Sequence, residues 1–332
     1  MTTAAPPAEQ IGITIDPWDP DYGTSLSAEA ISELDATTAE LDLDIEVPAA
    51  SWAPITPAAS RTRPRTLLIA DGVRRIDARV WVNKPSELPI PGFAASYAAG
   101  LVRCEPGTGS LAMLTGVGIR RSLFTPSHWV MHLRTTAGDY TVETTPDATV
   151  EKLAQALQQR LTELEVQLAT EYRATADDED LLIVDGPLRG RSHLPRTVGY
   201  IKTHHAPYLS GSPATVVGAL AEGQRTPVFL VGTRWRRHSW YLRLPTRSTA
   251  PWAGIARCEA ATNLSAKELT ELADITTLLL PGLAGVDYKD PRAPQNLIPI
   301  GGLEKLLRHR LGHRELLYRA LRVAATRLTE HS

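Results

Sequence analysis

Short apolar runs bounded by turn-forming residues dominate the chain from about residue 66 onward. Runs of this kind predict β-strands. The first two are TLLIADG at 66–72 and RIDARVWV at 75–82, which we expect to form separate, antiparallel strands. Further strands are predicted at 96–105, 181–186, 197–204, 226–233, 239–245 and 255–260.

Apolar residues three and four positions apart predict helices between and after these strands. One covers 150–174, a second covers 265–283 with Ser265 as its N-cap, and a third region covers 301–328. The order is strands, then a helix, then further strands and helices. This order predicts an α/β fold with one mixed β-sheet flanked by helices.

Charge is distributed unevenly along the chain. Residues 1–60 hold 11 of the 37 acidic residues and no Lys or Arg, which leaves 26 acidic and all 35 basic residues after them. We therefore expect two parts: an acidic, partly disordered segment over 1–60 with a candidate docking helix at 25–44, and a basic folded domain over 61–330. A basic body suits a polyanion such as nucleic acid, although a charged solubilising surface gives the same composition.

Several classes of protein are disfavoured by composition. Cys104 and Cys258 are too few and too far apart for a disulfide framework or a zinc set, which favours a reducing cytoplasm. No apolar run approaches the roughly 18 residues that a membrane span requires. The start, MTTAAPPAEQ, lacks the features of a signal peptide, and no phosphate-binding glycine loop occurs. We expect a soluble cytoplasmic protein.

Two aspartates end near-identical apolar runs. Asp71 follows LLIA, Asp185 follows LLIV, and glycine comes after each. Open α/β sheets place ligand sites at such strand ends, and two neighbouring carboxylates repel each other unless a cation lies between them. The pair therefore predicts a site for Mg²⁺ or Mn²⁺, which prefer oxygen ligands. The alternative is that both Asp-Gly pairs are ordinary turns.

A third carboxylate is expected from the helix at 150–174. Glu165 adjoins the apolar stripe of Leu161 and Leu168 and would face the sheet, where it needs a partner, whereas Glu163 points further outward. A solvated helix face is the alternative. Lys202, in the strand YIK, is a candidate for a cation directed at a substrate phosphate. The alternative is a lysine on an edge strand that reaches water. His204 and His205 follow it in a loop and carry no specific signal.

Arginine and aromatic residues alternate in TRWRRHSWYLRL at 233–244. Such a strand can neutralise phosphates and stack on bases, or it can be an amphipathic strand with a basic outer face. The first interpretation makes five residues candidates for nucleic-acid binding: Arg234, Trp235, Arg236, Arg237 and Trp240. Asp290, in the Pro-rich stretch YKDPRAPQN, would be a turn residue if taken alone.

Taken in order, these motifs resemble the NurA family of DNA-end-processing nucleases. The matching features are IADG, the Glu-bearing helix before IVDGPL, GYIKTH and DPRAPQNLIPIGGLE, which together span about 65–315. The resemblance implies an RNase H-like fold over 61–330, with Asp71, Glu165 and Asp185 as manganese ligands and Asp290 as a later acidic member of the site. It also implies a homodimer that acts on DNA ends with the hexameric ATPase HerA, in repair or in defence.

The implied reaction is phosphodiester hydrolysis with two bound ions, in which Lys202 offsets charge on the phosphate. One departure from the family pattern concerns the histidine expected shortly after the DPRAP stretch. Gly301 and Gly302 lie near its place, Glu304 is the nearest polar residue, and His309 and His313 follow further on. The alternative function is therefore a catalytically weakened module of the same fold that binds DNA or the ATPase.

Overall fold

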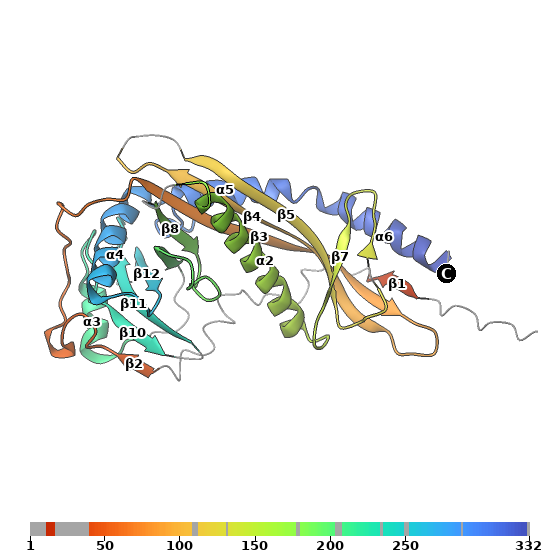
Figure 1. Ribbon diagram of the computed structural model, residues 1–332, viewed down its shortest axis with the longest axis horizontal. Coiled ribbons are helices and arrows are strands. Elements are labelled where there is room, and N and C mark those ends of the chain that lie inside the picture. Colours follow the sequence, from red (N-terminus) through yellow and green to blue (C-terminus); the bar gives the residue numbers. More distant parts are fainter. Residues whose placement is uncertain are drawn as a thin grey trace, which may run out of the picture.

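The computed structural model describes residues 11–16, 40–107, 112–130, 132–176, 180–202, 208–232, 235–248, 252–286 and 288–330. Their strands form one 12-stranded sheet, in the order β2-β10-β11-β12-β9-β8-β3-β4-β5-β7-β6, with β1 pairing separately with β3 (Figure 1). The strands are β1 (Gly12–Ile15), β2 (Glu40–Asp42), β3 (Thr66–Asn83), β4 (Ile90–Cys104), β5 (Met113–Thr125), β6 (His132–Leu133), β7 (Tyr140–Thr144), β8 (Asp180–Asp185), β9 (Thr197–Ile201), β10 (Phe229–Gly232), β11 (Arg236–Arg243) and β12 (Ile255–Ala260).

The centre of this sheet has the RNase H-like arrangement. Strands β3, β4 and β5 pair antiparallel in sequence order, and helix α2 (Val150–Arg173) then leads to β8, which lies parallel to β3. Strand β9 continues parallel to β8. The predicted fold class, a mixed β-sheet flanked by helices, is confirmed.

The two strands predicted at 66–72 and 75–82 are one continuous strand, so that prediction was wrong. Strand β3 runs through Asp71 and Gly72, and β4 pairs with it from Leu67 to Val82, with one register shift between Ile76 and Ala78. Long-range pairing with β4 therefore overrides the turn preference of the Asp-Gly pair. As a consequence, Asp71 lies within a strand, whereas Asp185 does end β8 as predicted.

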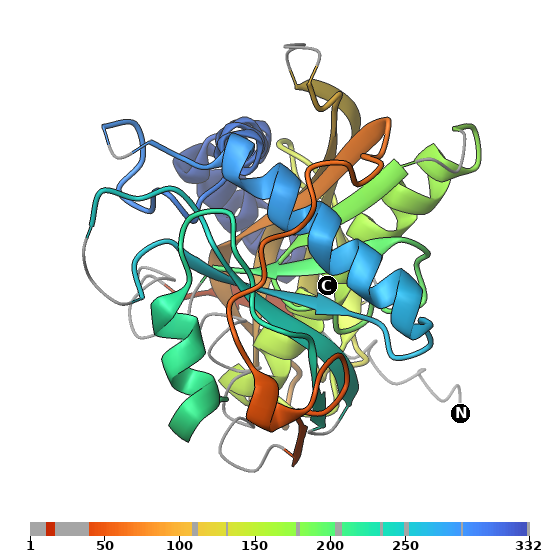
Figure 2. The same cartoon turned by 90° about the vertical axis from the view of Figure 1, so that its left-hand side faces the viewer.

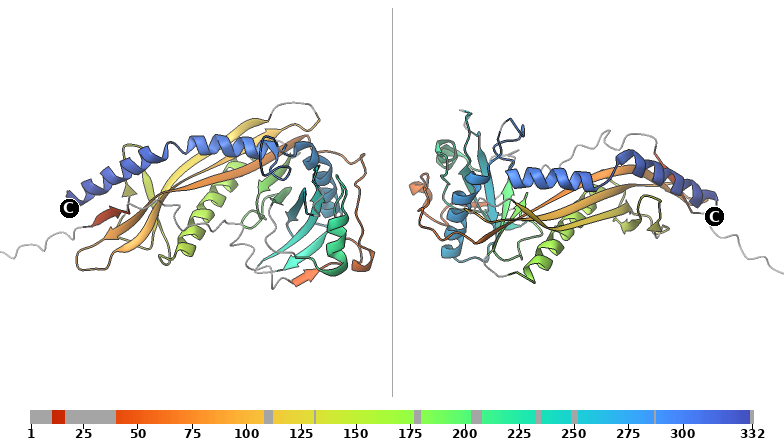
Figure 3. Two further views of the ribbon diagram at one scale, coloured as in Figure 1. Left: turned by 180° about the vertical axis from the view of Figure 1, so that it is seen from behind. Right: turned by 90° about the horizontal axis from the view of Figure 1, so that it is seen from above.

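Helices cover both faces of the long strands. Helix α2 packs on one face of β3 and β4, and α5 (Ile298–Arg310) packs on the other, followed by α6 (Arg314–Glu330), which contacts β1 and β3 (Figure 3). The helical region predicted at 301–328 is thus divided in two. Gly312, with φ of +86°, lies between α5 and α6, and only glycine adopts such a backbone angle at little cost.

The strands β10, β11 and β12 are also covered on both faces (Figure 2). Helix α4 (Ala266–Leu279), continued by the 3₁₀ turn η3 (Leu280–Leu283), covers one face, and α3 (Gly211–Ala219) covers the other. Ser265 caps α4 as predicted, in a capping box with Glu268. Helix α3 was not predicted, because its apolar residues lack a clear helical period.

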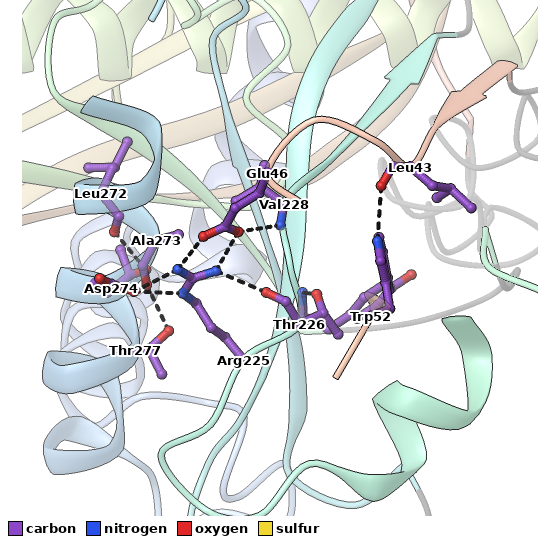
Figure 4. Close-up of polar contacts among 12 residues, drawn as sticks. Leu43, Glu46, Trp52, Arg225, Thr226, Val228, Leu272, Ala273, Asp274 and Thr277 are labelled. Atoms are coloured by element: carbon purple, nitrogen blue, oxygen red, sulfur yellow. Dashed lines mark hydrogen bonds and ion pairs between the residues drawn. The ribbon is translucent and has the colours of Figure 1, made fainter. Parts of the chain in front are cut away.

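The described part of the acidic segment belongs to this same sheet. Strand β2 pairs with β10, and the turn η2 (Ala49–Ser51) is followed by Trp52, whose ring lies 5.9 Å from that of Phe229. Arg225 is buried and bonds Glu46 at 2.8 Å and Asp274 of α4 at 2.7 Å (Figure 4). The boundary predicted at residue 60 therefore does not separate two structural units. The docking helix predicted at 25–44 is wrong at its described end, where residues 40–42 form strand β2, and residues 25–39 lie outside the described residues.

Candidate active site

Asp71 and Asp185 lie side by side on adjacent parallel strands. The β3–β8 register pairs Ala70 with Val184, so the next residue of each strand is an aspartate. Asp71 is only 6% exposed, and its Oδ1 accepts a hydrogen bond of 2.7 Å from the backbone N–H of Gly72. Burial raises the pKa of Asp71 well above its ordinary value, and the carboxylate of Asp185 raises it further. The predicted pairing of these two carboxylates is thus present.

Gly72 brings a third carboxylate to the pair. A Cβ atom at residue 72 would lie 2.6 Å from Oε1 of Glu165 and 2.6 Å from Leu161, both on α2. The absence of a side chain at residue 72 therefore permits close approach of the helix. Glu165 is buried, as its place beside the apolar stripe predicted, and its charge contributes to the raised pKa of Asp71. Glu163 instead lies exposed beside Arg160.

Arg191 is the partner that a buried Glu165 requires. Its Nε donates to Oε2 of Glu165 at 2.8 Å, its Nη2 donates to the same oxygen, and its Nη1 donates to the carbonyl of Pro187 at 3.0 Å. Arg191 is itself only 4% exposed. A buried Glu165 was expected to need a partner, but Arg191 was not identified, because it lies in a loop without hydrophobic periodicity.

Lys202 is bonded to Asp185. Its ammonium group lies 2.7 Å from Oδ2 of Asp185 and 3.1 Å from Oδ1 of Asn296, a buried residue that sequence reasoning did not identify. The amide nitrogen of Asn296 donates to Oδ2 of Asp290 at 2.6 Å. A polar chain thus runs from Asp185 through Lys202 and Asn296 to Asp290.

Asp290 joins the site through that chain. Its carboxylate also pairs with Arg292 at 3.1 Å, and hydrogen bonds from Arg292 lower the pKa of Asp290. Glu304, the residue nearest to the place of the expected family histidine, bonds Arg292 at 2.7 Å and Arg308 at 2.7 Å. Asp290 and Glu304 are therefore both in ion pairs with arginines. Asp290 orients Asn296, which in turn holds Lys202.

The strand predicted to stack on nucleic acid is mostly turned inward. Trp240 is fully buried in the core and Arg237 is 3% exposed, so their predicted role as surface contacts was wrong. Arg237 pairs with Glu259 of the next strand at 2.7 Å and lies 4.7 Å from the ring of Trp235. Arg236 is exposed, whereas Arg234 lies outside the described residues, as do His204 and His205.

The donor chemistry at Asp71, Asp185 and Glu165 suits a hard divalent cation. Besides burial, the two carboxylates of Asp185 and Glu165 raise the pKa of Asp71, and a cation among the three would relieve this repulsion. In the described part of the chain, however, no three Asp, Glu, His or Cys side chains form a ready-made group that could hold a metal ion. Lys202 and Arg191 provide the positive charge instead. A cation at Asp71 and Asp185 would have to displace Lys202 from Asp185, and it would meet Glu165 at Oε1, because Oε2 is held by Arg191.

No protein-family model and no curated protein matches the sequence. Among the described helices, none is long and apolar enough to cross a membrane.

Proposed function

We propose that this protein is a Mn²⁺- or Mg²⁺-dependent nuclease that hydrolyses phosphodiesters at DNA ends, in keeping with its resemblance to the NurA family. The observation that carries the proposal is the adjacency of Asp71 and Asp185 on parallel strands, with Glu165 packed against Gly72. Acidic groups arranged on an RNase H-like sheet are suited to a reaction in which bound cations assist in-line attack on phosphate.

Each residue of the site has a distinct task in this proposal. Asp71, Asp185 and Oε1 of Glu165 would hold the cation, which supplies an activated water and stabilises the leaving oxygen when it is bound. Lys202, held by Asn296, would turn from Asp185 toward the phosphate and offset its charge. Arg191 fixes the orientation of Glu165, as hydrogen-bonding partners of metal ligands commonly do.

A second candidate function is a module that binds DNA or an ATPase without cleaving DNA. Two observations favour it. Lys202 and Arg191 already neutralise two of the three carboxylates, and Glu304 near the place of the family histidine is held by Arg292 and Arg308.

A cleavage assay distinguishes these functions. Labelled single- and double-stranded DNA would be incubated with the full chain and Mn²⁺, and then with Mn²⁺ plus chelator. If the proposal is right, the wild type degrades DNA and the chelator stops the degradation. Asp185→Asn should abolish cleavage, whereas the control Glu163→Gln, on the exposed face of α2, should cleave like the wild type. DNA retention without cleavage at any Mn²⁺ concentration would favour the binding module. Full activity of Asp185→Asn would overturn the assignment of this site.

The family resemblance extends the proposal to partners. We propose a homodimer that acts with a HerA-like hexameric ATPase. Light scattering of the purified chain, alone and mixed with such an ATPase, tests both statements. A monomer that does not shift in mass on mixing would contradict them.

A further inference from the structure

Glu259 of β12 is a buried carboxylate that the proposed mechanism does not use. It is only 1% exposed. Its Oε1 accepts a hydrogen bond of 2.7 Å from Nε of Arg237 and lies 3.4 Å from Nη2 of Arg257, and both arginines are buried as well. These two cations explain how a charged Glu259 is tolerated away from water. They occupy Oε1 and leave the second oxygen, Oε2, for another contact.

Oε2 of Glu259 reaches the loop that follows Asp185. It accepts a hydrogen bond of 3.0 Å from the backbone N–H of Leu188, a buried residue that lies three positions after Asp185. Strand β9 lies between β8, which ends at Asp185, and β12, which carries Glu259. The hydrogen bond therefore crosses β9 and ties the loop to a strand that is not its neighbour.

Gly199 of β9 leaves room for this crossing. It pairs with Glu259 in the sheet, so the loop passes directly over it. A Cβ atom at residue 199 would lie 2.8 Å from the backbone nitrogen of Leu188 and 3.0 Å from the carbonyl oxygen of Gly186. A side chain at this position would therefore lift the loop off the strand and separate Leu188 from Glu259.

From Leu188 the contacts continue to Glu165. The carbonyl of Leu188 accepts a hydrogen bond of 2.9 Å from the backbone N–H of Arg191, which closes a turn. The side chain of Arg191 donates to the carbonyl of Pro187 at 3.0 Å and to Oε2 of Glu165 at 2.8 Å. The turn is thus held on one side by Glu259 and on the other by Glu165. We call this series of contacts the Glu259–Glu165 connection.

We infer that Glu259 is a positioning residue for the carboxylate site: it fixes Leu188, the turn then fixes Arg191, and Arg191 orients Glu165. The inference rests on the proposed function, because Glu165 matters there as a candidate metal ligand. A ligand that is already oriented binds a cation more tightly than one that must first be ordered. Residues that hold metal ligands in place commonly contribute about 10–100-fold to metal affinity. Glu259 therefore affects Mn²⁺ affinity without touching the ion.

Hydrogen exchange measured by mass spectrometry tests the loop end of the connection on the full chain, without metal or DNA. Glu259→Gln leaves one acceptor oxygen instead of two, so Leu188 and Arg237 cannot both keep their bonds. Exchange over residues 186–191 should then be about tenfold faster. Gly199→Ala should accelerate the same residues, because its Cβ displaces Leu188. Arg257→Met is the matched control, since it removes a cation from the same carboxylate but leaves the bond to Leu188, and exchange over 186–191 should stay near that of the wild type.

Mn²⁺ binding tests the other end of the connection, at Glu165. The concentration of free Mn²⁺ is measured by electron paramagnetic resonance, which requires no cleavage. Glu259→Gln and Gly199→Ala should each weaken Mn²⁺ affinity by about tenfold, whereas Arg257→Met should bind like the wild type. In the cleavage assay, the first two variants should need more Mn²⁺ for half-maximal activity and regain the wild-type rate at saturating Mn²⁺. A general loss of folded protein would lower the rate at every Mn²⁺ concentration instead.

Three results would overturn the inference. They are wild-type exchange over 186–191 in folded Glu259→Gln, faster exchange with unchanged Mn²⁺ affinity, and equal effects of Glu259→Gln and Arg257→Met. The nuclease proposal fails separately, since Mn²⁺ binding that depends on Glu259 without cleavage would contradict the nuclease and support the connection. If the wild type binds no Mn²⁺, the metal site fails, and a double-mutant cycle of unfolding decides the connection. Glu259→Gln and Arg191→Met should then destabilise less together than the sum of their separate effects, and additive effects would overturn it.

Discussion

Oε1 of Glu165 occupies the place where a side chain on Gly72 would be, since a Cβ there would lie 2.6 Å from that oxygen. Real Cβ atoms do not approach an oxygen so closely. The glycine after Asp71 therefore determines how near the carboxylate of α2 comes to the strand, and with it whether Asp71 and Glu165 can act together.

Substituting Gly72 by alanine should disturb both stability and the site. We expect Gly72→Ala to lower the free energy of unfolding by about 1–3 kcal/mol, because Glu165 and Leu161 must both move. Gly116→Ala on β5 is the control, since its Cβ would meet nothing nearer than 3.6 Å. Urea denaturation compares the two. Equal stability of both variants would contradict the close approach.

The ion pair between Arg191 and Glu165 gives a second prediction. Arg191→Met leaves a buried carboxylate without its cation and should cost about 3–5 kcal/mol of unfolding free energy. The double variant Arg191→Met/Glu165→Leu should be more stable than Arg191→Met alone, because the uncompensated charge is gone. Chemical denaturation of both variants measures the difference. A double variant less stable than the single one would show that the pair is not what holds α2 to the loop after Asp185.

Local sequence patterns predicted the helices and strands whose buried faces follow the period of their apolar residues. The stripe of Leu161 and Leu168 placed Glu165 against the sheet, and the repeated pattern of LLIADG and LLIVDG placed Asp71 and Asp185 on adjacent strands. Ser265 as a predicted N-cap located the start of α4, and the structure adds the capping box with Glu268. Each of these patterns lies within one short segment of the chain, so it can be recognised without knowledge of the tertiary fold.

The remaining features depend on partners distant in sequence. Asp71–Gly72 resembles a turn until β4 is present to pair with it. Trp240 and Arg237 resemble an outward basic strand, but Glu259 of the adjacent strand neutralises Arg237 and permits its burial. Asn296 lies just before α5 without any periodic signal, so its bond to Lys202 follows only from the tertiary fold.

Lys202 provides a third prediction, in which its ammonium group stands in for a bound cation at Asp185. Removing it with Lys202→Met should lower the melting temperature, because Asp71 and Asp185 then lose the positive charge that Lys202 places beside them. Mn²⁺ should raise the melting temperature of this variant by more than it raises that of the wild type, since a ligand that binds the folded state stabilises it. The exposed Lys305→Met on α5 is the control. An equal Mn²⁺ effect in all three proteins would contradict a cation site at these aspartates.

The attachment of the acidic segment should depend on pH. Glu46 bonds Arg225 and the backbone N–H of Val228 (Figure 4). Burial raises the pKa of Glu46, but Arg225 and the hydrogen bond from Val228 contribute to a larger lowering, so the net pKa lies below its ordinary value of 4.5. A carboxylate whose pKa is lowered by folding contributes stability that is fully present above its unfolded pKa. That contribution is lost as the pH falls through the folded pKa.

Glu46→Gln removes this titration while keeping a similar shape. We expect the variant to be less stable than the wild type at pH 7, by about 1.5–3 kcal/mol, because a hydrogen-bonded charge on the buried Arg225 is lost. The difference should begin to shrink near pH 4.5, where the unfolded chain starts to protonate Glu46, and should vanish below the lower pKa of the folded state, where the wild type has lost the same interaction. Urea denaturation at a series of pH values measures it, with the exposed Glu222→Gln as control. A difference that stays constant from pH 7 to pH 3 would mean that Glu46 does not hold residues 40–60 to the sheet through its charge.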